Sequence, residues 1–209
     1  MKSRICLIRH GITEGNVRKL YYGYSDIPLA EEGVEGLKKL TESGIYPDSE
    51  KTDFYTSGLI RTEQTLSLIY GQREHKVMDS LREINFGIFE MKSYHELNGL
   101  EEYQTWIGDK TGNLVCPGGE SLVGFQRRII KGFKELRKLH AVKELSLRHH
   151  KEEALSVVVC HGGTISAIME NTFPGKSGEA DNFFRWVPDP GHGYILTIDD
   201  GQIVGKEEF

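Results

Sequence analysis

Cysteine is scarce in this chain. Its 209 residues include three, Cys6, Cys116 and Cys160, and no two of them form a Cys-X-X-Cys pair. A disulfide-stapled secreted domain or a thiolate metal site normally shows an even, regularly spaced set of cysteines. We therefore expect reduced thiols in a cytoplasmic protein.

Long apolar runs and excess basic charge are also missing. The first apolar run, residues 5–8, is too short for a signal peptide, and no run approaches the roughly 18 residues that cross a membrane. The chain has 26 Lys and Arg against 31 Asp and Glu, a formal net charge of −5. General nucleic-acid or membrane-surface binders usually carry a basic excess, so we expect neither partner.

The composition is typical of one globular domain over residues 1–209, because 38% of the residues are hydrophobic and 27% are charged. Short apolar runs typical of strands alternate with amphipathic stretches typical of helices. The expected strands are residues 5–8, 53–57, 76–78 and 154–161, with a closing hairpin of 194–198 and 203–204; the expected helices are 29–40, 59–70, 122–139 and 164–173. This alternation predicts an α/β three-layer sandwich, with a mostly parallel central sheet and helices on both faces.

Two segments do not follow this alternation. Residues 85–103 are irregular and aromatic before they become helical, and residues 85–113 are predicted to form a lid or cap. Residues 143–153, KELSLRHHKEE, are mostly polar, which is typical of a solvated helix end and loop. Four histidines outside the strand ends are interpreted as solvated: His75, His140, His149 and His150.

Unusual polar residues stand where three of the predicted strands end. Arg9 and His10 end the first strand, Arg61 lies one turn into the helix after the second, and His161 ends the fourth. Ligands of open α/β sheets bind beyond the carboxyl ends of the strands, so these four side chains are expected to converge. Taken singly, each histidine has a structural alternative and Arg61 a surface one, and the hypothesis depends on their combination.

Such a cluster suits a phosphoryl group. Guanidinium groups match phosphate oxygens, and the glycines after His161 open a helix whose N-terminus favours negative charge. A neutral histidine nitrogen can attack phosphorus. The segment SLREINFGIFE offers Glu83 and Glu90 as proton sources, and a bound phosphate would keep Glu83 protonated. The alternative for Glu83 is a surface ion pair with Arg82.

Six segments, in order, resemble the histidine phosphatase superfamily, which includes the cofactor-dependent phosphoglycerate mutases. They are LIRHGITEGN, YYGYSDIPLAEEG, TSGLIRTEQT, LREINFGIFE, CPGGES and VVVCHGGTI, and they span nearly the whole chain. The resemblance implies that His10 is the nucleophile that becomes phosphohistidine. It implies that Arg9, Arg61 and His161 hold the phosphoryl oxygens, and that Glu83 is the general acid and base.

The same resemblance implies supporting residues. Asn16 and the backbone of Gly162 are expected to assist in phosphate binding, and Tyr22 and Gly23 belong to the segment similar to the substrate loop. No metal and no other cofactor is implied. The chain departs from the family pattern at two positions outside the catalytic core, Ile12 where Glu is frequent and Gly58 where Pro is frequent.

The interval between Glu83 and Gly119 is short and not basic, whereas the mutases carry an extra basic stretch there. This favours a phosphatase that acts on a small-molecule phosphomonoester. We expect the protein to be a monomer or a homodimer. The stretches FGIFEMKSYHEL and YYGYSDIPL are most similar to α-ribazole phosphatases. Phosphoglycerate mutase-type transfer and a non-catalytic phosphate-binding regulator remain alternatives.

Two other site classes are disfavoured by spacing. FPGKSG at 173–178 resembles a P-loop, but Glu170 stands where that motif needs Gly. The adjacent pairs His149-His150 and Cys160-His161 lack zinc-ligand spacing. Six aromatic residues are expected either at the pocket mouth, where they would favour a ring-bearing leaving group, or in the core: Tyr21, Tyr22, Tyr24, Phe86, Phe89 and Tyr103.

Overall fold

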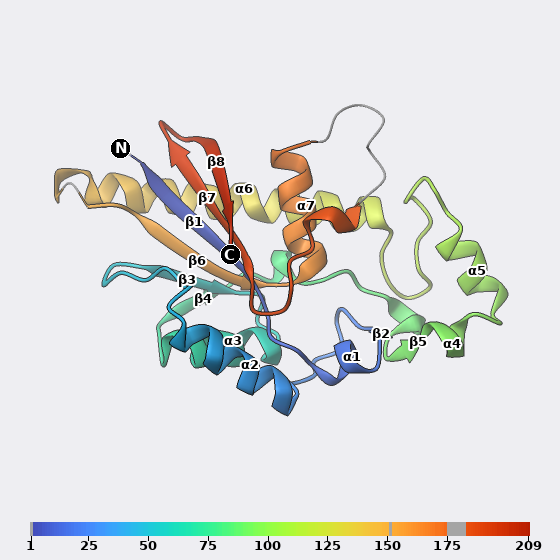
Figure 1. Ribbon diagram of the computed structural model, residues 1–209. Coiled ribbons are helices and arrows are strands. Elements are labelled where there is room, and N and C mark those ends of the chain that lie inside the picture. Colours follow the sequence, from blue (N-terminus) through green and yellow to red (C-terminus); the bar gives the residue numbers. More distant parts are fainter. Residues whose placement is uncertain (1, 151, 175–182) are drawn as a thin grey trace.

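The computed structural model describes residues 2–150, 152–174 and 183–209. Its centre is a six-stranded sheet in the order β4-β3-β6-β1-β7-β8 (Figure 1). The strands are β1 (Ser3–Arg9), β3 (Asp53–Thr56), β4 (His75–Val77), β6 (Leu155–Cys160), β7 (Gly193–Asp199) and β8 (Gln202–Glu208). The first four run parallel, and β7 pairs antiparallel with both β1 and β8.

Helices cover both faces of this sheet. The longer ones are α2 (Glu31–Glu42), α3 (Ile60–Tyr70), α6 (Leu122–Leu147) and α7 (Gly162–Thr172). Figure 1 shows α6 and α7 on one face and α2 and α3 on the other. The predicted three-layer sandwich with a mostly parallel sheet is confirmed.

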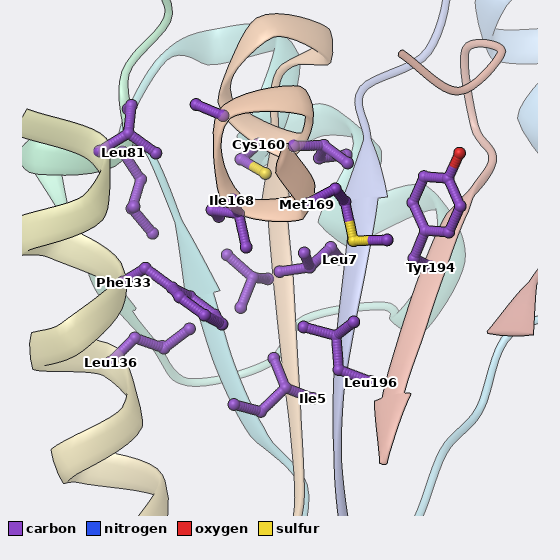
Figure 2. Close-up of a cluster of buried hydrophobic side chains, with 14 of the residues drawn as sticks. Ile5, Leu7, Leu81, Phe133, Leu136, Cys160, Ile168, Met169, Tyr194 and Leu196 are labelled. Atoms are coloured by element: carbon purple, nitrogen blue, oxygen red, sulfur yellow. The ribbon is translucent and has the colours of Figure 1, made fainter. Parts of the chain in front are cut away.

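The core consists of one apolar layer on each face of the sheet. Every residue of β6 is buried, as expected for a strand that is covered on both sides. Figure 2 shows Phe133 and Leu136 of α6, and Ile168 and Met169 of α7, directed at side chains of the strands. On the other face, Leu37 of α2 packs with Leu66 and Ile69 of α3 against the opposite sides of the same strands.

The register brings three strand ends to the same edge. Arg9 of β1 is level with Cys160 of β6, and Thr56 of β3 is level with Val159. The residues that follow, His10, His161 and Ser57, therefore leave the sheet side by side. Parallel pairing therefore accounts for the predicted convergence of Arg9, His10 and His161, while Arg61 is placed by α3, the helix that follows β3.

The helix predicted over residues 122–139 is longer than expected, and the helix end predicted within residues 143–153 is confirmed. Helix α6 does not end near residue 139 but continues to Leu147, which is buried. Lys143, within the polar stretch, bonds to Asp53 of β3 at 2.8 Å. The amphipathic pattern continues through the polar residues because the helix still packs on the strands.

His140 on α6 is also not solvated as expected. It is 1% exposed. Its ring lies between two hydroxyl groups, with Nδ1 2.8 Å from Ser156 Oγ and Nε2 2.9 Å from Ser3 Oγ. Two polar partners, one on β6 and one on β1, make a buried histidine acceptable.

The predicted hairpin exists, but its second strand is longer than residues 203–204. Asp200 and Gly201 adopt positive φ values of 46° and 70°, as a tight hairpin turn requires. Strand β8 then pairs with β7 as far as Glu208. The charged side chains of β8 are not typical of a strand, so the sequence did not predict its full length. The strand forms through main-chain hydrogen bonds to β7.

Short elements occupy the rest of the chain. They are α1 (Glu14–Val17), β2 (Leu20–Tyr21), η1 (Asp79–Leu81), η2 (Gly87–Phe89), β5 (Lys92–Ser93), α4 (Tyr94–Leu97), α5 (Glu101–Ile107), η3 (Arg148–His150) and η4 (Phe183–Trp186). β2 pairs with β5, which joins the segment after His10 to the predicted lid. Within the described residues, no helix has the length and apolarity that crossing a bilayer would need.

The predicted lid segment, residues 85–113, forms a small core together with Cys116, which follows it in the chain. Phe89, Leu97, Tyr103 and Cys116 are each fully buried in it. The expectation that Phe89 and Tyr103 line the pocket mouth is therefore wrong, and the core alternative holds for both. Their rings pack edge-on, with centroids 5.5 Å apart, because they are the centre of an aromatic cluster that includes Trp106.

Candidate active site

A cavity of about 350 Å³ lies at the edge where β1 and β6 end. Its lining comes from segments far apart in the sequence: Arg9, His10, Asn16, Leu20, Tyr21, Tyr22, Arg61, Glu83, Ile84, Phe86, Gly162, Gly163, Phe184 and Val187. Seven of the nine site residues expected from the sequence are among them. The other two, Gly23 and His161, lie just outside and contact lining residues.

His10 has a defined tautomer. Its Nδ1 lies 2.8 Å from the carbonyl oxygen of Gly11. A carbonyl can only accept, so Nδ1 carries a proton, and in the neutral ring Nε2 then keeps its lone pair. Burial lowers the pKa of His10 well below its ordinary value, and the positive charges of Arg61 and Arg9 lower it further against the Gly11 hydrogen bond. The ring is neutral at pH 7, which is the form a nucleophile needs.

Arg61 is fully buried beside His10. Its Nη1 donates to the carbonyl of Ser25 at 2.8 Å, and its Nη2 donates to the carbonyl of Gly23 at 2.7 Å. Its Nε has no partner among the described residues. The guanidinium also lies over the Tyr22 ring, with Cζ 5.1 Å from the centroid. A held guanidinium with a spare donor is suited to an anionic ligand.

Arg9 has a similar arrangement. Its Nη1 donates to the carbonyl of Pro188 at 2.7 Å, while its buried Nε has no partner in the described part of the chain. Gly162, the first residue of α7, lets it approach closely, since a Cβ there would lie 3.3 Å from Arg9 Nε and 3.0 Å from Val187. The pocket thus contains two arginines, each with a donor left over, beside a helix N-terminus.

Glu83 lies against the start of α7. Its Oε2 accepts from the N–H of Gly163 at 2.8 Å, and its Oε1 accepts from the N–H of Ile84 at 2.9 Å. Burial raises the pKa of Glu83, although these two hydrogen bonds and the charges of Arg61 and Arg9 oppose the rise. Glu83 is not the surface ion-pair partner of Arg82, which instead pairs with Asp79 at 2.8 Å.

His161 is fully buried and does not line the cavity. Its ring packs edge-on against His10, with centroids 5.2 Å apart. Its Nε2 lies 2.8 Å from Ser57 Oγ, while Nδ1 is buried without a partner among the described residues. Burial lowers the pKa of His161 well below its ordinary value, and the positive charge of Arg61 adds to this effect.

Asn16 and Tyr22 form one hydrogen-bonded unit with Thr13. Tyr22 Oη donates to Asn16 Oδ1 at 2.8 Å and accepts from Thr13 Oγ1 at 2.8 Å. Asn16 Oδ1 also accepts from the Thr13 backbone at 3.0 Å, in the capping box of α1. These bonds use the amide oxygen of Asn16, so its amide nitrogen is the group suited to a ligand oxygen.

The far wall of the cavity is apolar. Tyr21 and Phe86 pack edge-on with centroids 5.2 Å apart, and Tyr21 bonds to Tyr103 through their hydroxyls at 2.6 Å. Tyr24 does not belong to this wall, since its ring faces Arg82 and Arg128 instead. The expectation of an aromatic pocket mouth therefore holds for Tyr21, Tyr22 and Phe86.

Sequence reasoning missed several residues of the site. Phe184 and Val187 line the cavity from a stretch near the C-terminus that carries no recognisable motif. Ser57 was noted only as a strand end, yet its hydroxyl holds His161. Gly163 could have been found, because a Gly-Gly pair after a strand-end histidine indicates close backbone approach; a Cβ there would lie 2.4 Å from Glu83 Oε1.

Other site classes gain no support. The described residues contain no group of three or more His, Cys, Asp or Glu side chains placed to hold a metal ion. The P-loop-like stretch at 173–178 lies mostly outside the described residues. The cysteines Cys6, Cys116 and Cys160 are free and buried, as expected for reduced thiols.

Known proteins resemble this chain over most of its length. An adenosylcobalamin/alpha-ribazole phosphatase of Salmonella typhimurium is 29% identical over 180 residues, which cover 83% of this chain and 82% of that protein. A 2,3-bisphosphoglycerate-dependent phosphoglycerate mutase of Bradyrhizobium diazoefficiens is 34% identical over 131 residues, covering 56% of this chain and 60% of that protein.

A solved structure and a family model also match most of this chain. The alpha-ribazole phosphatase from Shigella flexneri superposes with a TM-score of 0.70 at 25% identity, covering 95% of this chain and 92% of that one. The model of the histidine phosphatase superfamily (branch 1) matches residues 5–207. The six ordered segments of the sequence predicted the histidine phosphatase superfamily, and the chain belongs to branch 1 of it.

Proposed function

We propose that this chain is a metal-independent phosphomonoesterase in which His10 is phosphorylated and dephosphorylated in each turnover. The observation that carries the proposal is the bond from His10 Nδ1 to the Gly11 carbonyl, which leaves Nε2 as a neutral nucleophile beside two arginines. Arg9 and Arg61 have the spare Nε donors that a phosphoryl group needs. His161 adds an unpartnered Nδ1 next to the His10 ring.

The reaction would run in two displacements. His10 Nε2 attacks phosphorus while the bond to the leaving oxygen breaks, and protonated Glu83 gives that oxygen its proton. Glu83 then takes a proton from water, whose oxygen attacks the phosphohistidine and breaks the nitrogen–phosphorus bond. Phosphate leaves, and His10 and Glu83 return to their starting states. The positive charges of Arg9 and Arg61 best match the transition state, where negative charge is spread over the phosphoryl oxygens.

The apolar wall supports an uncharged, ring-bearing leaving group. Leu20, Tyr21, Ile84 and Phe86 offer the cavity area on which such a ring can pack. The α-ribazole phosphatase relatives make α-ribazole phosphate the leading candidate substrate.

A mutase is the second candidate, because phosphoglycerate mutases are among the relatives. Its substrate would carry a second acidic group beyond the transferred phosphoryl. Among the described residues that line the cavity, the cationic side chains are Arg9 and Arg61, and the positive charges of both lower the pKa of His10. Both arginines are therefore at the end of the cavity where the phosphoryl group would bind. A second anion would find no cation on the apolar wall, so the hydrolase is favoured. A non-catalytic regulator would not need both His10 and Glu83.

The test is a panel of phosphomonoesters that includes α-ribazole phosphate, p-nitrophenyl phosphate and 3-phosphoglycerate. We expect hydrolysis to exceed mutase activity and kcat/KM to be higher for α-ribazole phosphate than for 3-phosphoglycerate. If 3-phosphoglycerate is isomerised faster than any substrate of the panel is hydrolysed, the proposal is overturned in favour of the mutase. The absence of all activity would favour the regulator.

A further inference from the structure

Glu90 is the second carboxylate of the segment that carries Glu83, and it does not line the cavity. Its carboxylate accepts four backbone N–H groups at 3.0 Å, from Gly23, Tyr24, Ser25 and Phe86. It also accepts the hydroxyl of Ser25 at 2.6 Å. Burial alone would raise the pKa of Glu90, but these hydrogen bonds outweigh it and lower the pKa. Glu90 is therefore a bound anion within a ring of backbone donors.

The loop of residues 23–25 separates this anion from Arg61. The N–H groups of Gly23 and Ser25 point at Glu90, whereas the carbonyls of the same two residues accept from Arg61 at 2.7 and 2.8 Å. The loop thus lies between a negative and a positive side chain, with donors on one side and acceptors on the other. The negative charge of Glu90 orients the loop through its N–H groups, and the positive charge of Arg61 orients the same loop through its carbonyls.

This arrangement differs from a direct salt bridge in a way that matters for phosphate binding. A carboxylate in contact with Arg61 would compete with the ligand for the guanidinium. Arg61 forms no ion pair with a carboxylate within the described residues, and its Nε stays unpartnered. The carbonyls hold the two Nη groups, and the negative charge of Glu90 lies one peptide layer away.

Steric contacts show that the loop cannot relax without consequence. A Cβ at Gly23 would lie 1.6 Å from the carbonyl oxygen of Ile84, so the loop lies directly on the residue after Glu83. Glu90 also accepts from Phe86 in the same segment. The arginine and the proposed acid are thereby positioned by one packed unit.

We propose that Glu90 is a positioning residue that aims Arg61 at the phosphoryl group through the loop of residues 23–25. The inference deepens the proposed function, since it assumes that the cavity binds a phosphoryl group. It predicts that loss of the Glu90 charge weakens phosphate binding although Glu90 touches no ligand. The effect must also require Arg61.

The test compares Glu90→Gln with the wild type by calorimetric binding of inorganic phosphate and orthovanadate. An amide at this position turns an NH₂ group toward backbone donors, so we expect both affinities to fall by at least about tenfold. Glu96→Gln is the matched control. Glu96 accepts from the Ser93 backbone at 2.8 Å and from its hydroxyl at 2.7 Å, in the same part of the chain but away from Arg61. Its affinities should equal those of the wild type.

A double-mutant cycle with Arg61→Lys separates positioning from general destabilisation. If Glu90 acts through Arg61, Glu90→Gln should change affinity less than about twofold in the Arg61→Lys background. Equal losses in both backgrounds, or no loss in the single variant, would overturn the inference. If Glu90→Gln fails to fold, the same cycle is measured with Ser25→Ala in its place. This variant removes the 2.6 Å hydrogen bond from the Ser25 hydroxyl to Glu90 and leaves the backbone donors intact.

The outcome for the wild type distinguishes the two proposals. A wild type that binds neither phosphate nor vanadate would contradict the proposed function of the cavity. A wild type that binds both, with Glu90→Gln unchanged, would contradict only the role assigned to Glu90.

Discussion

At the scale of single residues, the same burial has opposite effects on His10 and Glu83. It lowers the pKa of His10 and raises the pKa of Glu83, so each side chain is driven toward its neutral form. A neutral histidine and a protonated carboxyl are the pair that the first displacement needs. Burial in one site therefore shifts a nucleophile and an acid toward the forms that the proposed reaction uses, although the charges of Arg61 and Arg9 oppose the shift at Glu83.

Replacing His10 should abolish turnover without unfolding the protein. His10→Gln keeps most of the side-chain volume and removes the nucleophile, so we expect kcat to fall more than about 10³-fold. Brief reaction with a ³²P-labelled substrate should label the wild type in an acid-labile, base-stable form and leave the variant unlabelled. Near-normal turnover in His10→Gln would mean that water attacks phosphorus directly.

The role of Glu83 depends on the leaving group. Glu83→Gln cannot donate a proton, so hydrolysis of an alkyl phosphate should fall at least about 10²-fold, while p-nitrophenyl phosphate, which needs little protonation, should lose much less. The measurement is kcat/KM for both substrates in wild type and variant. Equal losses on the two substrates would indicate that Glu83 only shapes the pocket.

At the scale of elements, α6 connects the sheet to the segment that carries Glu83. Near its start, Arg128 donates to the carbonyls of Ser80, Arg82 and Glu83 at 3.1, 2.9 and 3.2 Å, and it pairs with Glu120 at 2.5 Å. Near its other end, His140 bonds across to β1 and β6. One helix thus ties the position of the proposed acid to the strands that end in the histidines.

His140 should make stability depend on pH. Burial lowers its pKa in the folded state, so the unfolded state binds the proton more strongly. Stability should be complete above the unfolded pKa of about 6.5 and should decrease as the pH falls from there toward the lower folded value. The urea midpoint of the wild type should drop between pH 7.5 and 5.5, and the drop should be smaller in His140→Gln. An identical drop in both would assign the effect to other groups.

At the scale of the whole molecule, charge is distributed unevenly. The chain carries a net charge of −5, yet its cavity is lined by Arg9 and Arg61 together with His10, against which the buried His161 packs. The overall charge argued against polyanionic partners, and it did not prevent a small cavity lined by two arginines. Local packing, not composition, decides the charge that a ligand meets.

Activity should not require a metal ion. The proposed site neutralises the phosphoryl oxygens with arginines and a helix N-terminus, so no divalent cation is needed for that purpose. Exhaustive dialysis against EDTA should leave kcat unchanged for p-nitrophenyl phosphate. Loss of activity that Mg²⁺ restores would contradict the proposed chemistry.

Much of the fold and site could be predicted from local sequence. The buried strand at 154–161 was recognisable because a continuous apolar run suits a strand covered on both faces, and Arg9, His10 and His161 were recognisable because they follow such runs. Their convergence then followed from parallel pairing. These features depend on side-chain pattern and strand direction, which a sequence records directly.

Other features were decided only by tertiary structure. His140 looks like a solvated residue in a polar helix end, and it is buried because Ser3 and Ser156, far away in the sequence, supply its hydrogen bonds. Glu90 faces backbone N–H groups of a loop more than sixty positions earlier. Sequence by itself determined which chemical groups the chain offers and the strand ends that carry them. The burial, pKa shifts and hydrogen-bond partners of those groups arose from long-range packing, because each depends on atoms that only folding brings within contact distance.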